Sequence, residues 1–392
     1  MNDSSFASWP NFSDEEANAV RDVVQSNRVN YWTGQIGREF EKDFAKWTGS
    51  AHAIALTNGT VALDLALKAL DIGEGDEVIV TPRTFIASVS CVVTAGATPV
   101  FADVDPDSGN ITPDAICAAI SDRTRAIIPV HLAGWPCDMP KIMDIARQNN
   151  LYVIEDCAQA HGASVGGQMV GSLGDIGAWS FCQDKIMTTG GEGGMTTTNR
   201  PDLWEKMWSY KDHGKSWDAV YNRAHPPGFR WLSESFGTNW RMLEMQAAIG
   251  LIQLRQMSQW TNLRTRNAKA LQSVLRAFPQ AIRVPEPPDG HNHAYYRFYG
   301  YVRPEGLKSG WTRDRIVQEV SDLGYPAFQG SCSEVYLEKA FEGTGWTPQE
   351  RLPVARELGE TSVMLLVHPS IEEEQLRGYC DAVQTVMQNA VR

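Results

Sequence analysis

The chain has 392 residues, of which 43% are hydrophobic and 21% charged, proportions that are ordinary for a globular protein. This length predicts one large α/β domain and a smaller one, because a single hydrophobic core stops growing at roughly 250–300 residues. The net charge of −12 argues against a nucleic-acid partner, because an acidic surface repels phosphate backbones.

The sequence shows no targeting segment. The stretch Met1–Ser5 has neither a basic region nor an apolar run, so we expect no signal peptide. Apolar runs such as 363–367 are too short to cross a membrane. The seven cysteines have neither metal-ligand nor redox-motif spacing, which favours free thiols. We therefore expect a cytoplasmic protein without a membrane partner or a metal.

Helical signals open the chain, and short apolar runs then alternate with helical segments. A helix is expected after Ser13, with Glu16 completing a capping box, and another over 37–47. From about residue 53 the pattern becomes that of an α/β protein. Strands are expected at 78–80, 99–101, 126–130 and 152–154, with helices at 61–70 and 141–148. This rhythm predicts a mostly parallel sheet covered on both faces, with ligands at the carboxyl ends of its strands.

A different rhythm begins after a long helical stretch at 246–259. A Pro-rich segment at 285–288 is followed by an expected strand at 295–302, a helix at 312–323 and a last helix at 372–388. We therefore expect a large α/β domain over 1–265 and a smaller C-terminal α+β domain over 266–392.

Three motifs carry the chemistry. Asn58-Gly59-Thr60 opens a helix, where free N–H groups and a partial positive charge suit a phosphate, although a plain helix cap would use the same residues. Asp156 follows an apolar strand, where a carboxylate is able to hold a protonated ring nitrogen or serve as a satisfied cap. Lys185 follows the next apolar strand, before four glycines in 190–194. Lysine forms Schiff bases when its surroundings suit, and the alternative is a surface lysine beside a turn.

In this order, the motifs resemble those of pyridoxal-phosphate (PLP) enzymes with the aspartate-aminotransferase fold. The chain is similar to the sugar aminotransferases of the DegT–StrS type, which aminate keto sugars carried on nucleotides. The resemblance spans about 32–369 and rests on seven segments in the same order: 58–60, 84–88, 129–131, 155–163, 180–185, 190–194 and 237–242.

The resemblance implies a role for each matching residue. Lys185 would form the Schiff base and shuttle the proton, and Asp156 would keep the pyridine nitrogen protonated. The other cofactor contacts would be Phe85 on the ring face, Gln159 at the ring hydroxyl, and Gly59, Thr60, Val61 and Ser180 at the phosphate. Asn239 would reach the phosphate of the neighbouring subunit, which implies a homodimer with shared active sites. Thr33 and Gly34 would border the substrate.

Other residues are less clearly placed by the resemblance. Many relatives have a less polar pair where this chain has Gln183-Asp184. Arg83 is a candidate for contact with the substrate's diphosphate, because a guanidinium matches phosphate geometry, and the alternative is a solvated loop arginine. His131, His161 and His213 are expected to be structural hydrogen-bonding residues.

The function expected from the resemblance is transfer of an amino group from glutamate to a nucleotide-linked keto sugar, such as a 4-keto-6-deoxy hexose. The cofactor would alternate between PLP and pyridoxamine phosphate. Three alternatives stay open: a 3-keto-sugar or cyclitol aminotransferase on the same fold, and a non-catalytic regulatory protein that kept the fold. A dinucleotide-binding dehydrogenase is disfavoured, because no G-x-G-x-x-G follows the first strand.

Overall fold

The computed structural model describes residues 6–392. The stretch Met1–Ser5, used above against a signal peptide, lies outside them. Across the described range, no helix is both long and apolar enough to cross a membrane.

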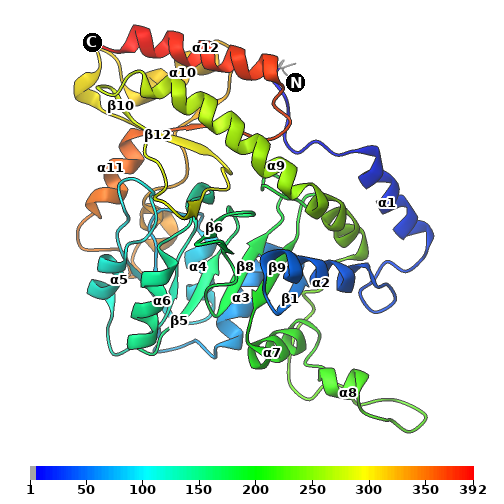
Figure 1. Cartoon of the computed structure of the whole chain (residues 1–392). Helices are drawn as coiled ribbons and strands as arrows, with labels where there is room; N and C mark the ends of the chain where they lie inside the picture. Colours follow the sequence, from blue (N-terminus) through cyan, green and yellow to red (C-terminus); the bar gives the residue numbers. More distant parts are fainter. Residues whose placement is uncertain (1–5) are drawn as a thin grey trace.

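A sheet of seven strands forms the centre of the larger part of the molecule (Figure 1). The order of its strands is β1 (His52–Leu56), β9 (Gly194–Thr198), β8 (Ile176–Ser180), β5 (Tyr152–Asp156), β4 (Thr124–Ile128), β2 (Glu77–Val80) and β3 (Thr98–Phe101). The pairs from β8 through β3 are parallel, whereas β9 pairs antiparallel with both β8 and β1. The predicted mostly parallel sheet is confirmed.

Helices cover both faces of this sheet, because its strands are apolar on both sides. Val78 and Val80 pack into one core together with α3 and α4, whereas Ile79 between them packs into another beside α6. The helices of this part are α1 (Asp14–Gln25), α2 (Ile36–Thr48), α3 (Gly59–Ala69), α4 (Ala87–Thr94), α5 (Pro113–Ala119), α6 (Met139–Gln148), α7 (Pro201–Lys211) and α8 (Trp217–Tyr221). Ser13 and Glu16 form the expected capping box of α1.

A second, antiparallel sheet lies in the C-terminal part. The order of its strands is β10 (Ile282–Arg283), β12 (Phe298–Val302), β14 (Ser362–Leu365) and β13 (Ala327–Phe328). It packs with α10 (Arg313–Asp322) and α12 (Glu373–Ala390), and α11 (Pro353–Thr361) lies beside β12. A small third sheet joins β11 (His291–Asn292), β6 (Ser164–Val165) and β7 (Gln168–Met169).

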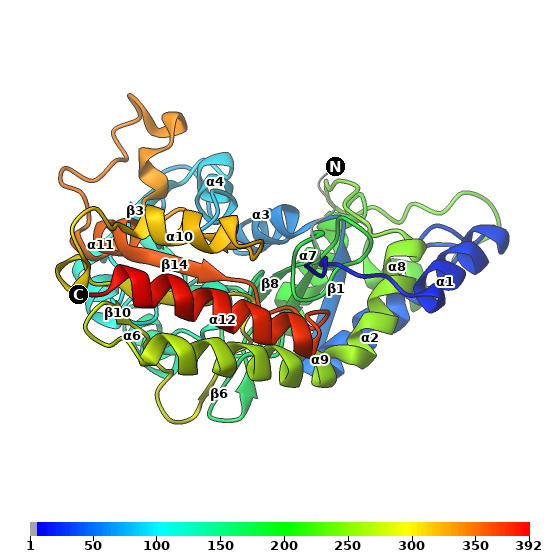
Figure 2. The ribbon, with the colours of Figure 1, turned by 90° about the horizontal axis from the view of Figure 1, so that it is seen from above.

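The long helix α9 (Glu244–Arg276) connects the two parts. Near its start it packs against α1 and α2, and further along it packs against α12, as Figures 1 and 2 both show. The helix is much longer than the 246–259 expected, and the expected domain boundary at 265 falls inside it.

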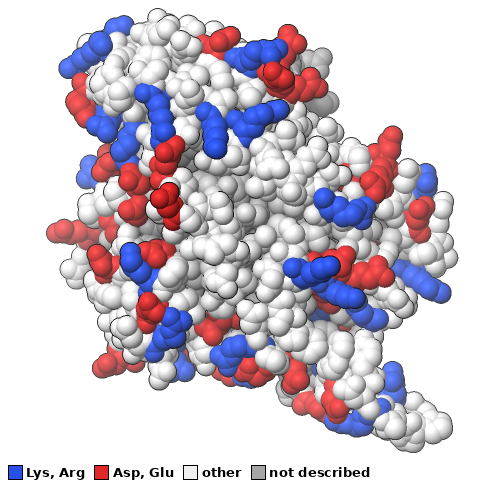
Figure 3. All heavy atoms as spheres, viewed as in Figure 1, with Lys and Arg blue, Asp and Glu red and all other residues white. Residues whose placement is uncertain are grey.

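Charged side chains do not gather into one large patch on the face shown in Figure 3. Basic and acidic side chains are interspersed around its margin, and the middle of the face is mostly uncharged. This face therefore lacks the continuous basic stripe that would follow a phosphate backbone.

Candidate active site

A cavity of about 810 Å³ opens at the carboxyl ends of β5 and β8. Its lining includes Asp156 at the end of β5, Ser180 at the end of β8, and Lys185 just beyond. The two strands are parallel neighbours, with Asp156 paired to Ala178, so both end at the same edge of the sheet. The sheet therefore brings together residues that are about 30 positions apart in sequence.

Asp156 is a buried carboxylate without a cationic partner among the described residues. Its side chain accepts hydrogen bonds from Ser88 Oγ at 2.7 Å and from the N–H of Ala158 at 3.1 Å. Thr84 Oγ1 lies 2.7 Å from Ser88 Oγ and orients that hydroxyl. A buried carboxylate costs several kcal/mol unless a positive group pairs with it, so a cation entering the cavity would be favoured here.

The start of α3 also lines the cavity and is suited to hold an anion. Asn58 caps the helix by accepting from the N–H of Val61 at 3.0 Å. Helix geometry leaves the N–H groups of Gly59 and Thr60 available to a ligand. A Cβ on Gly59 would stand 2.5 Å from Ser180 Cβ, so only glycine allows the helix start to lie this close to β8.

Phe85 and Gln159 also line the cavity, as the resemblance implies. Phe85 is 66% exposed, a high value for a phenylalanine, and presents its ring to the open space. Gln159 is buried, and its Oε1 accepts from the N–H of Ala133 at 2.7 Å. That bond fixes the amide orientation and leaves Nε2 without a partner among the described residues.

Lys185 is half-buried, and its Nζ has no ion pair or hydrogen bond among residues 6–392. The ammonium lies 5.1 Å from the centroid of the Tyr296 ring. The Lys185 backbone is fixed by Trp9, whose indole N–H donates to its carbonyl oxygen at 2.8 Å. The lysine is thus anchored at its backbone and free at its amine, which suits a Schiff-base lysine.

Sequence reasoning did not assign roles to several residues that the structure places in the site. Ser88 lies in a segment quoted for the resemblance, but its contact with Asp156 requires the packing of α4 against β5. Tyr296 and Arg297 precede β12 and reach the cavity from the C-terminal part. Tyr296 Oη donates to Asp184, which joins the polar position before Lys185 to this second wall.

The three residues expected at the substrate, Thr33, Gly34 and Arg83, do not line the cavity. Arg83 is fully buried and donates to Ser333 Oγ at 2.7 Å and Ser362 Oγ at 2.9 Å. It therefore joins the loop after β2 to the C-terminal part, and its burial leaves it no access to a substrate in this structure.

Thr33 and Gly34 belong to the turn that leads into α2. Thr33 is exposed and bonds to the carbonyl of Asn30. Gly34 is buried against Glu244, whose carboxylate caps α2 by accepting from the N–H groups of Ile36 and Gly37. A Cβ on Gly34 would lie 2.1 Å from that carboxylate, so steric crowding is enough to require glycine at this position.

Asn239 is exposed and does not line the cavity of its own chain. Its backbone pairs with that of Asp212, which is fully buried and bonds to Arg241 at 2.6 Å and Lys215 at 3.0 Å. These contacts hold Asn239 in a defined place on the surface.

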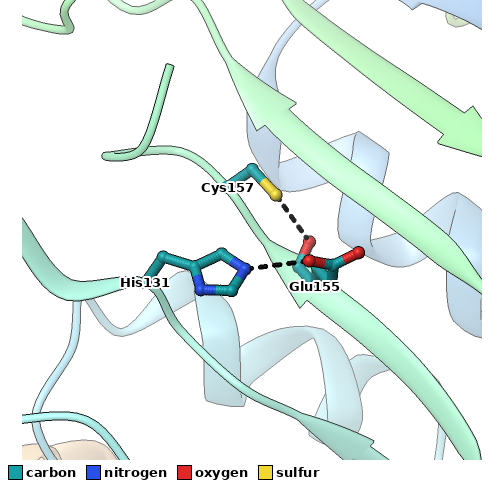
Figure 4. Close-up of side chains that lie close together, drawn as sticks. All are labelled: His131, Glu155 and Cys157. Atoms are coloured by element: carbon teal, nitrogen blue, oxygen red, sulfur yellow. Dashed lines mark hydrogen bonds and ion pairs between the residues drawn. The ribbon is translucent and has the colours of Figure 1, made fainter. Parts of the chain in front are cut away.

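A buried cluster of His131, Glu155 and Cys157 has the composition of a metal site (Figure 4). Its ligand atoms are, however, hydrogen-bonded or protonated. His131 Nδ1 accepts from the N–H of Cys137 at 3.0 Å, so the proton is on Nε2, which lies 3.0 Å from Glu155 Oε2. Burial raises the pKa of the Cys157 thiol well above its usual value, which keeps the sulfur protonated.

Glu155 is instead a structural anchor for the end of β5. Its carboxylate also accepts from the N–H groups of Gly171, Leu173 and Gly174 at 2.7–2.9 Å. The neighbouring Asp156 backbone bonds on both sides to the segment after β4, at Pro129 and His131. The anchor thus fixes Asp156 in position. The structural role expected of His131 agrees with these bonds.

Comparisons with known proteins identify the family. The model of the DegT/DnrJ/EryC1/StrS aminotransferase family matches residues 10–384. The chain belongs to this family. It is a PLP-dependent sugar aminotransferase.

Two curated relatives and two solved structures show the range of the likeness. A GDP-perosamine synthase of Caulobacter vibrioides is 42% identical over 78% of this chain and 79% of its own. A UDP-N-acetyl-3-dehydro-alpha-D-glucosamine 3-aminotransferase of Acidithiobacillus ferrooxidans is 38% identical over 89% and 88%. The structure of an aminotransferase from Psychrobacter cryohalolentis has a TM-score of 0.97 at 59% identity, covering 98% and 99%. A Streptococcus pneumoniae protein solved in PLP form shares the fold, with a TM-score of 0.85 at 24% identity over 97% of both chains.

The residues of the cavity fit this cofactor. The buried Asp156 carboxylate lacks a cation, the helix start at Gly59 and Thr60 offers free N–H groups, and Lys185 has a free amine. A pyridinium nitrogen, a phosphate and an aldehyde carbon are the matching groups of PLP. Residues within 6–392 thus supply a chemical partner for each of these three groups.

Ser88 should support cofactor binding through Asp156. Replacing Ser88 with Ala removes a hydrogen bond to the buried carboxylate, so we expect the dissociation constant for PLP to rise about 3- to 10-fold. PLP titration followed by absorbance measures the effect. Ser90→Ala, a half-buried serine on the same helix outside the cavity, is the matched control. Equal dissociation constants for the two variants would show that Ser88 does not support the site.

Proposed function

We propose that the protein transfers an amino group from L-glutamate to a nucleotide-linked keto sugar, with a 4-keto-6-deoxy hexose as the acceptor. The observation that carries this proposal is the single cavity in which a free lysine amine, a buried unpaired carboxylate and a helix N-terminus face the same space. Its volume of about 810 Å³ lies in the upper part of the range for ligand sites, so a substrate would fit beside a cofactor.

Each of the main cavity residues would have a separate role in the proposed amino-group transfer. When PLP is bound, it supplies an electron sink for the carbon that bears the amine. Asp156 would hold the positive charge of the ring nitrogen, and the start of α3 would hold the phosphate. Lys185 Nζ would take the proton from the donor's Cα and later deliver a proton to the acceptor carbon. Phe85 would cover one face of the ring and help to exclude water.

An amino-acceptor panel tests the proposal. With L-glutamate as donor, we expect kcat/KM for a 4-keto-6-deoxy sugar on UDP, GDP or dTDP to exceed that for a 3-keto sugar nucleotide or a keto cyclitol by about tenfold or more. Formation of 2-oxoglutarate is the measurement. Lys185→Ala should lower every rate by about 100-fold or more, since the proton shuttle is lost.

The outcome of the panel separates the alternatives. A preference for the 3-keto sugar would replace the proposed acceptor, and the Acidithiobacillus relative favours that result. Absence of turnover with every donor and acceptor, in protein that folds and binds PLP, would favour a regulatory protein.

We also propose that the enzyme is a homodimer in which Asn239 contributes to the partner's active site. Asn239 follows a segment whose large apolar side chains are exposed: Phe229 at 77%, Trp231 at 79% and Phe236 at 100%. Figure 1 shows this segment, after α8, projecting from the body of the molecule. Apolar side chains clustered on a projection are a common sign of an interface, and a second copy is the partner that shared sites require.

Subunit complementation tests the shared site. Lys185→Ala and Asn239→Ala should each have low activity at limiting PLP. A mixed dimer has one site with both changes and one with neither, so co-expression should restore up to about a quarter of wild-type activity. Pairing Lys185→Ala with the Lys185→Ala/Asn239→Ala double variant cannot form an intact site and is the control. Equal activity in the two mixtures, with mixed dimers present, would rule out a shared site.

A further inference from the structure

Among the described residues that line the cavity, only Lys185 and Arg297 carry a positive charge. The amine of Lys185 is needed for the chemistry, so it is not available as a lasting partner for an anion. An amino acid that donates its amine brings a carboxylate two bonds from the reacting nitrogen. A negative charge held in a half-buried site needs a positive partner nearby.

Arg297 lines the same cavity as Lys185, on the side of Tyr296. Its guanidinium carbon is 4.1 Å from the centroid of the Tyr296 ring, and Lys185 Nζ is 5.1 Å from the same centroid. The two cations thus share one aromatic neighbour and lie within a small molecule's length of each other. The Arg297 side chain is 14% exposed, so its charge is only weakly screened by water.

The guanidinium is held in place but its hydrogen bonds are not saturated. Nη1 donates to the carbonyl of Tyr296 at 3.1 Å, and Nη2 lies 3.3 Å from Asp184 Oδ2 and 3.4 Å from Tyr296 Oη. Nε donates to no described residue. Asp184 is the one carboxylate in contact with Arg297, and its side chain is 53% exposed.

The Asp184 carboxylate contacts the Arg297 guanidinium, as the carboxylate of a substrate would do. Burial would raise its pKa, but Lys185, Tyr296 and Arg297 together lower the pKa below its ordinary value, so it is charged at neutral pH. The Asp184 side of this ion pair is open to water and the contact is long, at 3.3 Å, so an incoming carboxylate is able to share the guanidinium or displace Asp184.

We propose that Arg297 binds the α-carboxylate of the amino donor. The planar guanidinium matches a carboxylate through two parallel hydrogen bonds, which Lys185 cannot offer. The inference rests on the proposed function, because it assumes an amino-acid donor. It assigns to the C-terminal part of the chain the recognition of the donor, whereas the cofactor contacts described above come from the large sheet and its helices.

The test is a binding titration with L-2-methylglutamate, which lacks the Cα proton and therefore binds without turnover. PLP-loaded wild type, Arg297→Gln and Arg297→Lys are titrated while the absorbance of the bound cofactor is followed. We expect Arg297→Gln to raise the dissociation constant about 10- to 100-fold, and Arg297→Lys to recover part of the loss.

Arg283→Gln is the matched control. Arg283 is a half-buried arginine in the same part of the chain, stacked 4.7 Å over Tyr301 and paired with Asp107, but it does not line the cavity. Its replacement should leave the dissociation constant for L-2-methylglutamate within about twofold of wild type. Melting temperatures of all variants confirm that they are folded.

The other outcomes overturn the inference in distinguishable ways. Wild-type affinity in Arg297→Gln would show that Arg297 does not bind the donor. Unchanged L-2-methylglutamate binding with weaker binding of UDP, GDP or dTDP would place the sugar nucleotide's phosphates at Arg297 instead. If wild type itself shows no spectral response to L-2-methylglutamate or to any amino acid, the proposed function fails and this inference fails with it.

Discussion

The site depends on a buried negative charge that the described protein groups do not neutralise. Asp156 is 5% exposed and has two hydrogen-bond donors but no cation among residues 6–392. Such a carboxylate is costly to bury, so a positive group that enters the cavity would be stabilised beside it. A protonated pyridine nitrogen is that group in a PLP enzyme. The same contact would keep the cofactor ring protonated, which would link the energetics of the fold to the chemistry.

Much of the surrounding structure serves to hold this carboxylate and the free lysine at fixed positions. The His131–Glu155 cluster anchors the end of β5, and Ser88 on α4 reaches the carboxylate from another layer. Trp9, far away in sequence, fixes the backbone of Lys185. Tyr296 then closes the cavity from the C-terminal part, so the site needs both parts of the chain in their observed arrangement.

The sequence was sufficient to predict the sheet and the edge at which Asp156 and Lys185 lie, for a physical reason. In a parallel sheet, the residues after successive strands meet at one edge, so strand patterns alone indicate that Asp156 and Lys185 are close. Neighbouring residues also determine helix caps, and the Ser13 box was predicted for that reason. Element boundaries were less accurate, most clearly for α9, whose length depends on partners at both of its ends.

Residues defined by distant contacts could not be predicted in this way. Arg83 resembled a phosphate-binding loop arginine, but two serines some 250 and 279 positions away hold it in the interior. Gly34 was expected to border the substrate, and no local pattern indicates the steric need for glycine that the carboxylate of Glu244 creates there. The contact between Tyr296 and Asp184 spans 112 positions, and no local pattern indicates it.

The most direct test of the role of Lys185 is to locate the covalent attachment of the cofactor. The protein is loaded with PLP, reduced with borohydride, digested and analysed by mass spectrometry, with and without prior addition of L-glutamate. We expect a pyridoxyl adduct on the peptide that contains Lys185, and its loss when L-glutamate is added first. An adduct on another lysine, or none in protein that binds PLP, would contradict the assignment of Lys185 as the catalytic residue.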